Sequence, residues 1–229
     1  MLNNEYKSKY FSVLGDSIST LFGYSEPLDA AFYTTANRYE SGVYYPEDTW
    51  WGRVIEAFGG KLLCNDSFSG STVCYDPLNE IQSYGCSDCR TSRLGSDGIN
   101  PDVILVFMGI NDRGLNARLR PSRVDEKGDL TIFSEAYSAM LSKLRSNYPT
   151  AEIWCLTLPL SDSAAVSPIA IQKSKEYSAV IKECAGLHSC LVVDIGEVVY
   201  DSTDGLHPNN EGMKALATAV CRVLRVPKP

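Results

Sequence analysis

Five short apolar runs constrain the fold more than any other feature of the sequence. They are residues 10–14 (YFSVL), 61–65 (KLLCN), 103–108 (VILVFM), 152–158 (EIWCLTL) and 191–195 (LVVDI). The central runs are apolar at almost every position, which is typical of strands that are buried on both faces of a parallel sheet. The sequence therefore predicts five β-strands.

Helical patterns separate these runs. Apolar residues recur at helical spacing within residues 51–58, 133–144, 177–184 and 213–224. Ser167 and Pro168 are typical of an N-cap and the first helical turn. Strands that alternate with helices predict a three-layer α/β/α sandwich with a five-stranded parallel sheet. Because no repeat, low-complexity segment or linker interrupts the pattern, we expect one domain over residues 1–229.

The charge of the chain argues against one class of partner. With 21 basic and 28 acidic residues the net charge is −7, whereas binding to nucleic acid requires a basic face. No apolar run approaches the ~18 residues of a membrane-spanning helix. The start of the chain, MLNNEYKSKY, lacks the apolar core of a secretory signal. We expect a cytoplasmic protein without nucleic-acid partner or membrane span, although a removed leader would leave no trace; the oligomeric state stays open.

The eight cysteines do not make a complete metal site. Only Cys86 and Cys89, in CSDC, have the spacing of a ligand pair, whereas a structural zinc site requires about four ligands. Cys74 and His188 lie at unsuitable positions along the chain to complete it. We therefore expect no metal and free thiols at Cys86 and Cys89, with a disulfide between these two as the alternative.

Four polar clusters follow predicted strands. They are GDSIST (15–20), NDSFSGST (65–72), GINDRG (109–114) and DSTDGLHPN (201–209). Sites in this architecture form beyond the carboxyl ends of the strands, which meet at one edge of the sheet. We therefore expect the four clusters to converge.

The clusters contain the groups that acyl transfer requires. A serine such as Ser17 becomes a nucleophile when a base, most often histidine, removes its proton. His207 lies three residues after Asp204, a carboxylate that can fix the imidazole tautomer and stabilise the imidazolium. The N–H groups of Ser17 and Gly70 and the side-chain amide of Asn111 could donate to a developing oxyanion.

The blocks GDSIS, NDSFSG, GIND and DGLHPN, in this order, resemble the signature blocks of the SGNH/GDSL hydrolase family. The resemblance runs from about Tyr10 to Val220 and implies a flavodoxin-like fold and an ester hydrolase that forms an acyl-enzyme. It implies no metal or organic cofactor. It also assigns roles: Ser17 as nucleophile, His207 as base, Asp204 as its partner, and Ser17, Gly70 and Asn111 as the oxyanion hole. Ile18 departs from the family pattern, which has leucine at this position.

An aromatic segment indicates the substrate class. Residues 21–51 hold nine of the 23 aromatic residues: Phe22, Tyr24, Phe32, Tyr33, Tyr39, Tyr44, Tyr45, Trp50 and Trp51. Some must belong to the core, Trp51 above all, but a segment rich in tyrosine and poor in aliphatic residues suits a sugar better than a fatty acyl chain. We expect an enzyme that deacetylates a carbohydrate or a small ester, with lysophospholipase and thioesterase as alternatives. Candidate substrate contacts are Asp16, Tyr24, Tyr44 and Tyr45.

A charged segment, residues 113–130, follows Asn111 directly. It carries five basic and three acidic residues, and loops of this length are often lids or binding segments. We expect part of it to overhang the site and Arg113 or Arg118 to pair with an anionic group of the substrate. The alternative is a solvated loop without substrate contact.

Other interpretations remain for these residues. Taken singly, Ser17 can cap a helix, Asp204 and His207 can belong to an ordinary turn, and Gly70 and Asn111 can adopt a left-handed conformation. A different class of protein, a flavin-binding domain, would use GDSIST as a phosphate cradle, but leaves the GIND and DGLHPN blocks unexplained. The intact serine, aspartate and histidine argue against a non-catalytic carbohydrate-binding relative. The absence of G-x-S-x-G argues against a standard α/β-hydrolase.

Overall fold

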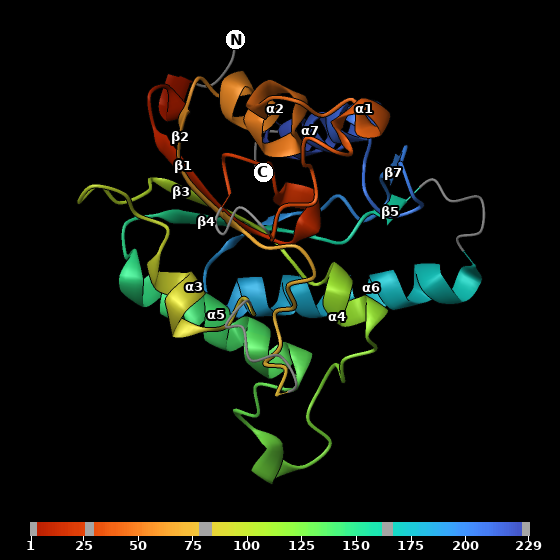
Figure 1. The fold of residues 1–229 in the computed structure, drawn as a ribbon. Coiled ribbons are helices and arrows are strands. Elements are labelled where there is room, and N and C mark those ends of the chain that lie inside the picture. Colours follow the sequence, from red (N-terminus) through yellow and green to blue (C-terminus); the bar gives the residue numbers. More distant parts are fainter. Residues whose placement is uncertain (1–3, 26–29, 78–83, 162–166, 226–229) are drawn as a thin grey trace.

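The centre of the structure is a parallel sheet of five strands. The structure is a computed structural model that describes residues 4–25, 30–77, 84–161 and 167–225. The strands are β1 (Tyr10–Gly15), β2 (Lys61–Ser67), β3 (Val103–Phe107), β4 (Glu152–Leu156) and β6 (Leu191–Val193). Their order in the sheet is β2-β1-β3-β4-β6 (Figure 1). This is the flavodoxin-like strand order, and all five predicted strands are confirmed.

Helices cover both faces of this sheet. Figure 1 shows α2 (Trp50–Ala57) and α7 (Asn210–Arg225) on one face, and α5 (Phe133–Asn147) and α6 (Pro168–Leu187) on the other. The predicted three-layer α/β/α sandwich is therefore confirmed. Shorter elements are α1 (Arg38–Ser41), α3 (Asp88–Ser92), α4 (Ile110–Gly114) and the 3-10 turns η1 (Asn4–Tyr6), η2 (Ser17–Ser19), η4 (Pro46–Asp48) and η5 (Val124–Glu126). Within the described ranges, no helix is long and apolar enough to cross a membrane.

The residue pattern explains why these elements form and pack. All five residues of β3 are buried, because helices cover it on both sides. The apolar stripe of α5 is fully buried: Phe133, Ala136, Tyr137, Met140, Leu141 and Leu144. Burial of each large side chain stabilises the fold by about 1.5–3 kcal/mol. As predicted, Ser167 is the N-cap of α6: its Oγ accepts a hydrogen bond from the Ala170 N–H at 3.2 Å, and Pro168 opens the first turn.

Two further strands were not predicted from the sequence. β5 (Leu160–Ser161) and β7 (Val199–Tyr200) pair in parallel as a small second sheet. Two residues are too few to show a periodic pattern. Strand β7 directly precedes the polar cluster of residues 201–209, and it thereby fixes where that cluster starts.

Candidate active site

Three side chains from opposite ends of the chain form a hydrogen-bonded series at the carboxyl edge of the sheet. Ser17 opens the turn η2 directly after β1, and its Oγ lies 2.9 Å from Nε2 of His207. The other ring nitrogen of His207, Nδ1, lies 2.7 Å from Oδ2 of Asp204. The carboxylate, the imidazole and the hydroxyl therefore lie in the order that nucleophilic activation of a serine requires.

The turn that carries His207 is held from within and from outside. Oδ1 of Asp204 accepts the backbone N–H groups of Leu206 at 3.0 Å and of His207 at 2.8 Å. From the other end of the chain, the buried Tyr33 donates its hydroxyl to the carbonyl of Pro208 at 2.7 Å. Burial by itself raises the pKa of Asp204, but its hydrogen bonds with His207 and Leu206 bring the pKa below the ordinary value. The carboxylate is thus ionised beside the imidazole at neutral pH.

The turn that carries Ser17 depends on the residue before it. Asp16 caps η2, since its Oδ1 accepts the N–H of Ile18 at 3.1 Å. The residue is 1% exposed, and among the described residues no group donates to its Oδ2. Burial, and to a lesser extent Asp112, raises the pKa of Asp16 to about 7. Contrary to the expectation of a substrate contact, the Asp16 carboxyl group lies buried beneath the turn.

The two other expected oxyanion donors, Gly70 and Asn111, come together at the turn that follows β2. Nδ2 of Asn111, in α4, donates to the carbonyl of Ser71 at 2.8 Å, which places the amide beside Gly70. Gly70 has a φ of +78°, and a Cβ there would meet no atom within 4 Å. The backbone conformation, rather than lack of room, therefore requires glycine at this position.

Asp112 anchors the same turn from below. Its carboxylate accepts the backbone N–H groups of Val73 at 2.8 Å and Cys74 at 2.9 Å, and the side chain is fully buried. Burial raises the pKa of Asp112, and these hydrogen bonds oppose the shift. This role was missed in the sequence, where the only signal was its place beside Asn111 in the GIND block.

Phe32 was also missed. Its ring stacks on the imidazole of His207, with 3.5 Å between the ring centroids and 12° between the planes. Thr20 positions this residue, because its Oγ1 accepts the N–H of Phe32 at 2.8 Å and donates to the carbonyl of Ser17 at 2.8 Å. The aromatic segment 21–51 was noticed in the sequence, but nothing there distinguished Phe32 from its neighbours.

The tyrosines expected to contact substrate are exposed. Their exposed fractions are 48% for Tyr24, 37% for Tyr44 and 60% for Tyr45. The segment of Tyr44 and Tyr45 lies next to the start of α7, because Nδ2 of Asn210 donates to the carbonyl of Gly42 at 2.7 Å. In contrast, Tyr33, Trp50 and Trp51 are fully or almost fully buried and belong to the core, as we expected for Trp51.

The charged segment divides into two parts. Arg113 lies in α4 rather than in a loop, and its Nη1 donates to Oγ of Ser174 at 2.5 Å. Burial lowers the pKa of Arg113, while the nearby Tyr200 and Asp16 oppose this shift. Its guanidinium group therefore lies within electrostatic range of the residue that precedes the serine.

Arg118 is placed differently. It is exposed and pairs with Glu126 within its own loop, with 2.9 Å between Nη1 and Oε1. Figure 1 shows the part of this loop around η5 projecting from the molecule beyond α5, away from the sheet. The two ends of this loop are held together by the backbone, because the carbonyl of Arg118 accepts the N–H of Phe133 at the start of α5. The guanidinium group of Arg118 is thus engaged by Glu126 of its own loop.

The remaining histidine and the cysteine pair lie elsewhere. Nε2 of His188 is 2.7 Å from Oγ of Ser138, and the residue precedes β6 at the amino edge of the sheet, as expected for a structural histidine. Burial lowers the pKa of His188. Cys86 and Cys89 are free thiols. Across the described residues, no cluster of three or more His, Cys, Asp or Glu side chains could hold a metal ion.

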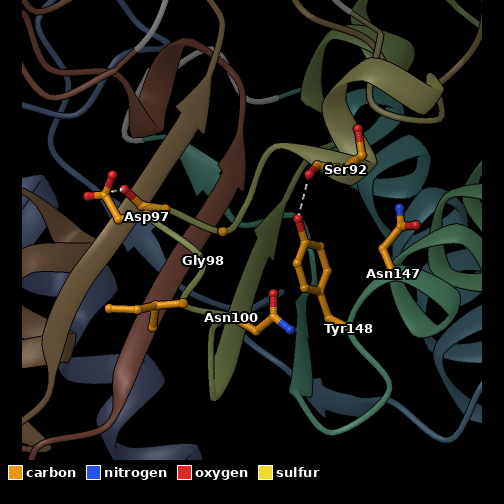
Figure 2. A pocket seen from close by; sticks show the side chains of 9 residues that line it. Ser92, Asp97, Gly98, Asn100, Asn147 and Tyr148 are labelled. Carbon is orange, nitrogen blue, oxygen red and sulfur yellow. Dashed lines mark hydrogen bonds between the residues drawn. The ribbon is translucent and has the colours of Figure 1, made fainter.

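A shallow polar hollow lies at the same amino edge (Figure 2). Ser92, the 95–100 segment, Asn147 and Tyr148 line it. These residues precede β3 and β4, whereas Ser17 and Asn111 follow β1 and β3. The hydroxyl of Tyr148 is engaged with the backbone of Ser92 and Leu94. This hollow is therefore separate from the candidate active site.

Known proteins resemble this chain in sequence and in structure. The model of the family "GDSL-like Lipase/Acylhydrolase" matches residues 9–224. No match was found among curated proteins. A candidate GDSL-like lipase from Bacteroides ovatus has a similar crystal structure, with a TM-score of 0.76 and 25% identity over 96% of this chain and 99% of that chain.

Two other solved structures show the same similarity. A candidate GDSL-like lipase from Bacteroides uniformis has a TM-score of 0.72 and 29% identity over 94% of both chains. A carbohydrate acetylesterase from Sinorhizobium meliloti has a TM-score of 0.66 and 16% identity over 95% of this chain and 99% of that chain, and so shares the fold. The family resemblance inferred from the four blocks is confirmed. The chain belongs to the GDSL-like lipase/acylhydrolase family.

Proposed function

We propose that this protein is a serine ester hydrolase that works through an acyl-enzyme. The observation that carries the proposal is the series from Asp204 through His207 to Ser17, with separations of 2.7 Å and 2.9 Å. A phosphate-binding role for the GDSIST turn, the alternative class, would leave this series without a purpose.

In the acylation step, Oγ of Ser17 attacks the carbonyl carbon of the ester while Nε2 of His207 takes the hydroxyl proton. The ionised Asp204 holds the Nδ1–H tautomer and stabilises the imidazolium that forms. His207 then returns the proton to the alcohol that leaves. In the second step water attacks the acyl carbon while His207 takes its proton. The bond between the acyl group and Oγ of Ser17 then breaks, the carboxylic acid leaves, and His207 returns the proton to Ser17.

Negative charge develops on the substrate carbonyl oxygen in both steps. We assign its stabilisation to the N–H groups of Ser17 and Gly70 and to the amide of Asn111. One N–H of the Asn111 amide donates to Ser71, and the second can donate to the oxyanion, since an amide nitrogen carries two hydrogens.

The substrate is an acetylated carbohydrate or another ester with a small acyl group. The exposed rings of Tyr24, Tyr44 and Tyr45 support this assignment, because aromatic faces stack well on sugar rings. The fold also carries carbohydrate acetylesterase activity in the structural neighbour from Sinorhizobium meliloti. No group of the proposed mechanism requires a metal or an organic cofactor.

A serine-directed phosphonate and a panel of esters test the proposal. The phosphonate should add one equivalent of label to Ser17 and abolish hydrolysis, and Ser17→Ala should be inactive and unlabelled. Acetylated sugars and p-nitrophenyl esters of increasing acyl length then define the substrate. A preference for long acyl chains would favour a lysophospholipase or thioesterase. Full activity of Ser17→Ala would contradict the serine hydrolase mechanism.

A further inference from the structure

Arg90 has a buried side chain whose purpose the four sequence blocks do not explain. It lies in α3, and its side chain is 0% exposed. A buried guanidinium group is tolerated only where acceptors pair with its N–H groups. The acceptors around Arg90 therefore show what this residue connects.

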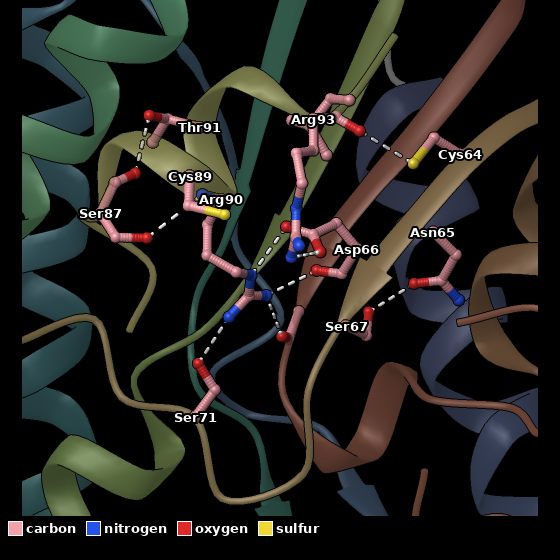
Figure 3. Close-up of polar contacts among 12 residues, drawn as sticks. Cys64, Asn65, Asp66, Ser67, Ser71, Ser87, Cys89, Arg90, Thr91 and Arg93 are labelled. Atoms are coloured by element: carbon pink, nitrogen blue, oxygen red, sulfur yellow. Dashed lines mark hydrogen bonds and ion pairs between the residues drawn. The ribbon is translucent and has the colours of Figure 1, made fainter. Parts of the chain in front are cut away.

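Among the described residues, the guanidinium group of Arg90 donates to three separate segments (Figure 3). Nε donates to Oδ2 of Asp66 at 2.7 Å, and Nη2 donates to the carbonyl of the same residue at 2.5 Å. Nη2 also donates to the carbonyl of Gly15 at 2.9 Å, and Nη1 donates to Oγ of Ser71 at 2.7 Å. One side chain thus joins the carboxyl ends of β1 and β2 and the turn that follows β2.

Each of these segments leads to a group of the proposed mechanism. Gly15 precedes Ser17 by two residues. Ser71 directly follows Gly70, and its carbonyl accepts the Asn111 amide at 2.8 Å. Gly15 is itself tightly packed, because a Cβ there would lie 2.5 Å from Cβ of Ser19. Ser17 therefore lies two residues after a carbonyl that accepts from Arg90. Gly70 directly precedes Ser71, whose Oγ accepts from Arg90, and Asn111 is hydrogen-bonded to the backbone carbonyl of Ser71.

We propose that Arg90 is a positioning residue for the oxyanion hole. It keeps the Gly70 N–H and the Asn111 amide at the spacing from Ser17 that the transition state requires, and this inference rests on the proposed function. Donors to an oxyanion act only over a narrow range of distances, so a small displacement of the turn lowers the rate. Lysine cannot replace arginine here, because a single ammonium group lacks the planar fork that reaches acceptors in several directions.

The test compares Arg90→Lys with a matched variant, Arg93→Ala. Arg93 pairs with the other oxygen of the same carboxylate, Oδ1 of Asp66, at 2.7 Å, and its side chain is 45% exposed. We expect Arg90→Lys to lower kcat about 10- to 100-fold with KM within about 3-fold of the parent. Arg93→Ala should keep the parent kcat. The thermal unfolding midpoint of each variant shows whether it is folded.

A second variant keeps the test decisive if Arg90→Lys does not fold. Ser71→Ala removes the Oγ that accepts from Arg90 and that donates to the carbonyl of Thr72 at 3.3 Å. It leaves the carbonyl that accepts from Asn111, and its kcat should fall several-fold. A folded Arg90→Lys with the parent kcat, or Ser71→Ala with the parent kcat, would overturn the role of Arg90 but not the proposed function. A parent protein without esterase activity, or an active Ser17→Ala, would overturn the proposed function itself.

Discussion

The ring of Phe32 lies flat on the imidazole of His207, with 3.5 Å between their centroids and 12° between their planes. The stack covers one face of the base and restricts rotation of the imidazole. We expect Phe32→Ala to lower kcat about 2- to 10-fold, because an aromatic pair contributes about 0.5–1.5 kcal/mol beyond its buried area. Phe32→Tyr should keep most of the activity. Steady-state kinetics check both variants.

Phe22→Ala is the control for this prediction. Phe22 belongs to the same segment but is 38% exposed, so its removal should leave kcat unchanged. Parent-like kcat in Phe32→Ala would show that the hydrogen bonds to Ser17 and Asp204 suffice to orient His207.

The two histidines of the chain should respond very differently to substitution. His207→Ala should lower kcat about 100- to 10,000-fold, because it removes the base whose Nε2 lies 2.9 Å from Oγ of Ser17. Asp204→Ala should cost less, about 10- to 1000-fold, since it removes a group that orients and stabilises the imidazole but does not itself transfer the proton. His188→Ala, at the opposite edge of the sheet, should retain the parent kcat. Equal losses for Asp204→Ala and His207→Ala would indicate that the carboxylate is as indispensable as the base.

Asp16 should make the stability of the protein depend on pH. Burial raises the pKa of its carboxyl group from 3.8 to about 7 in the folded state, so the folded protein binds more protons than the unfolded chain between these pH values. The stability that this proton contributes is complete below pH 4 and is lost as pH rises through about 7.

Asp16→Asn removes this titration while keeping an oxygen that can accept from the Ile18 N–H. We expect the variant to match the parent in free energy of unfolding near pH 4 and to exceed it by roughly 2–4 kcal/mol near pH 8. Urea unfolding of both proteins at the two pH values measures the difference. A constant difference between them across this range would contradict the raised pKa.

Arg113 and Arg118 form a matched pair for testing charge recognition. Arg113 is half-buried and within electrostatic range of Asp16, whereas Arg118 pairs with Glu126 on the projecting loop. We expect Arg113→Ala to lower kcat/KM for an anionic acetyl ester by an amount that corresponds to about 1–3 kcal/mol of lost transition-state stabilisation. The kcat/KM for a neutral ester should show no matching loss. Arg118→Ala should leave both esters unaffected. Equal losses for the two esters in Arg113→Ala would mean that its bond to Ser174 only supports the fold.

The sequence alone was sufficient for the architecture, and it predicted the residues of the chemistry that we propose for the site. A strand such as 103–107 shows its burial in its own composition, and parallel strands bring the segments after them to one edge. Ser17, Gly70, Asn111, Asp204 and His207 could be identified because each lies in a short block with a recognisable pattern. The structure brings these segments together as expected.

Only the tertiary structure decided what surrounds these residues. Arg90 and Phe32 contact residues that are far away along the chain, such as Gly15 and His207, and no local sequence pattern marks either side chain. Asp16 and Arg118 looked like substrate contacts in the sequence, but in the structure the first is buried and the second pairs with Glu126 of its own loop. Periodicity and motifs report on neighbours along the chain, whereas the packing around a side chain depends on segments that only folding brings together.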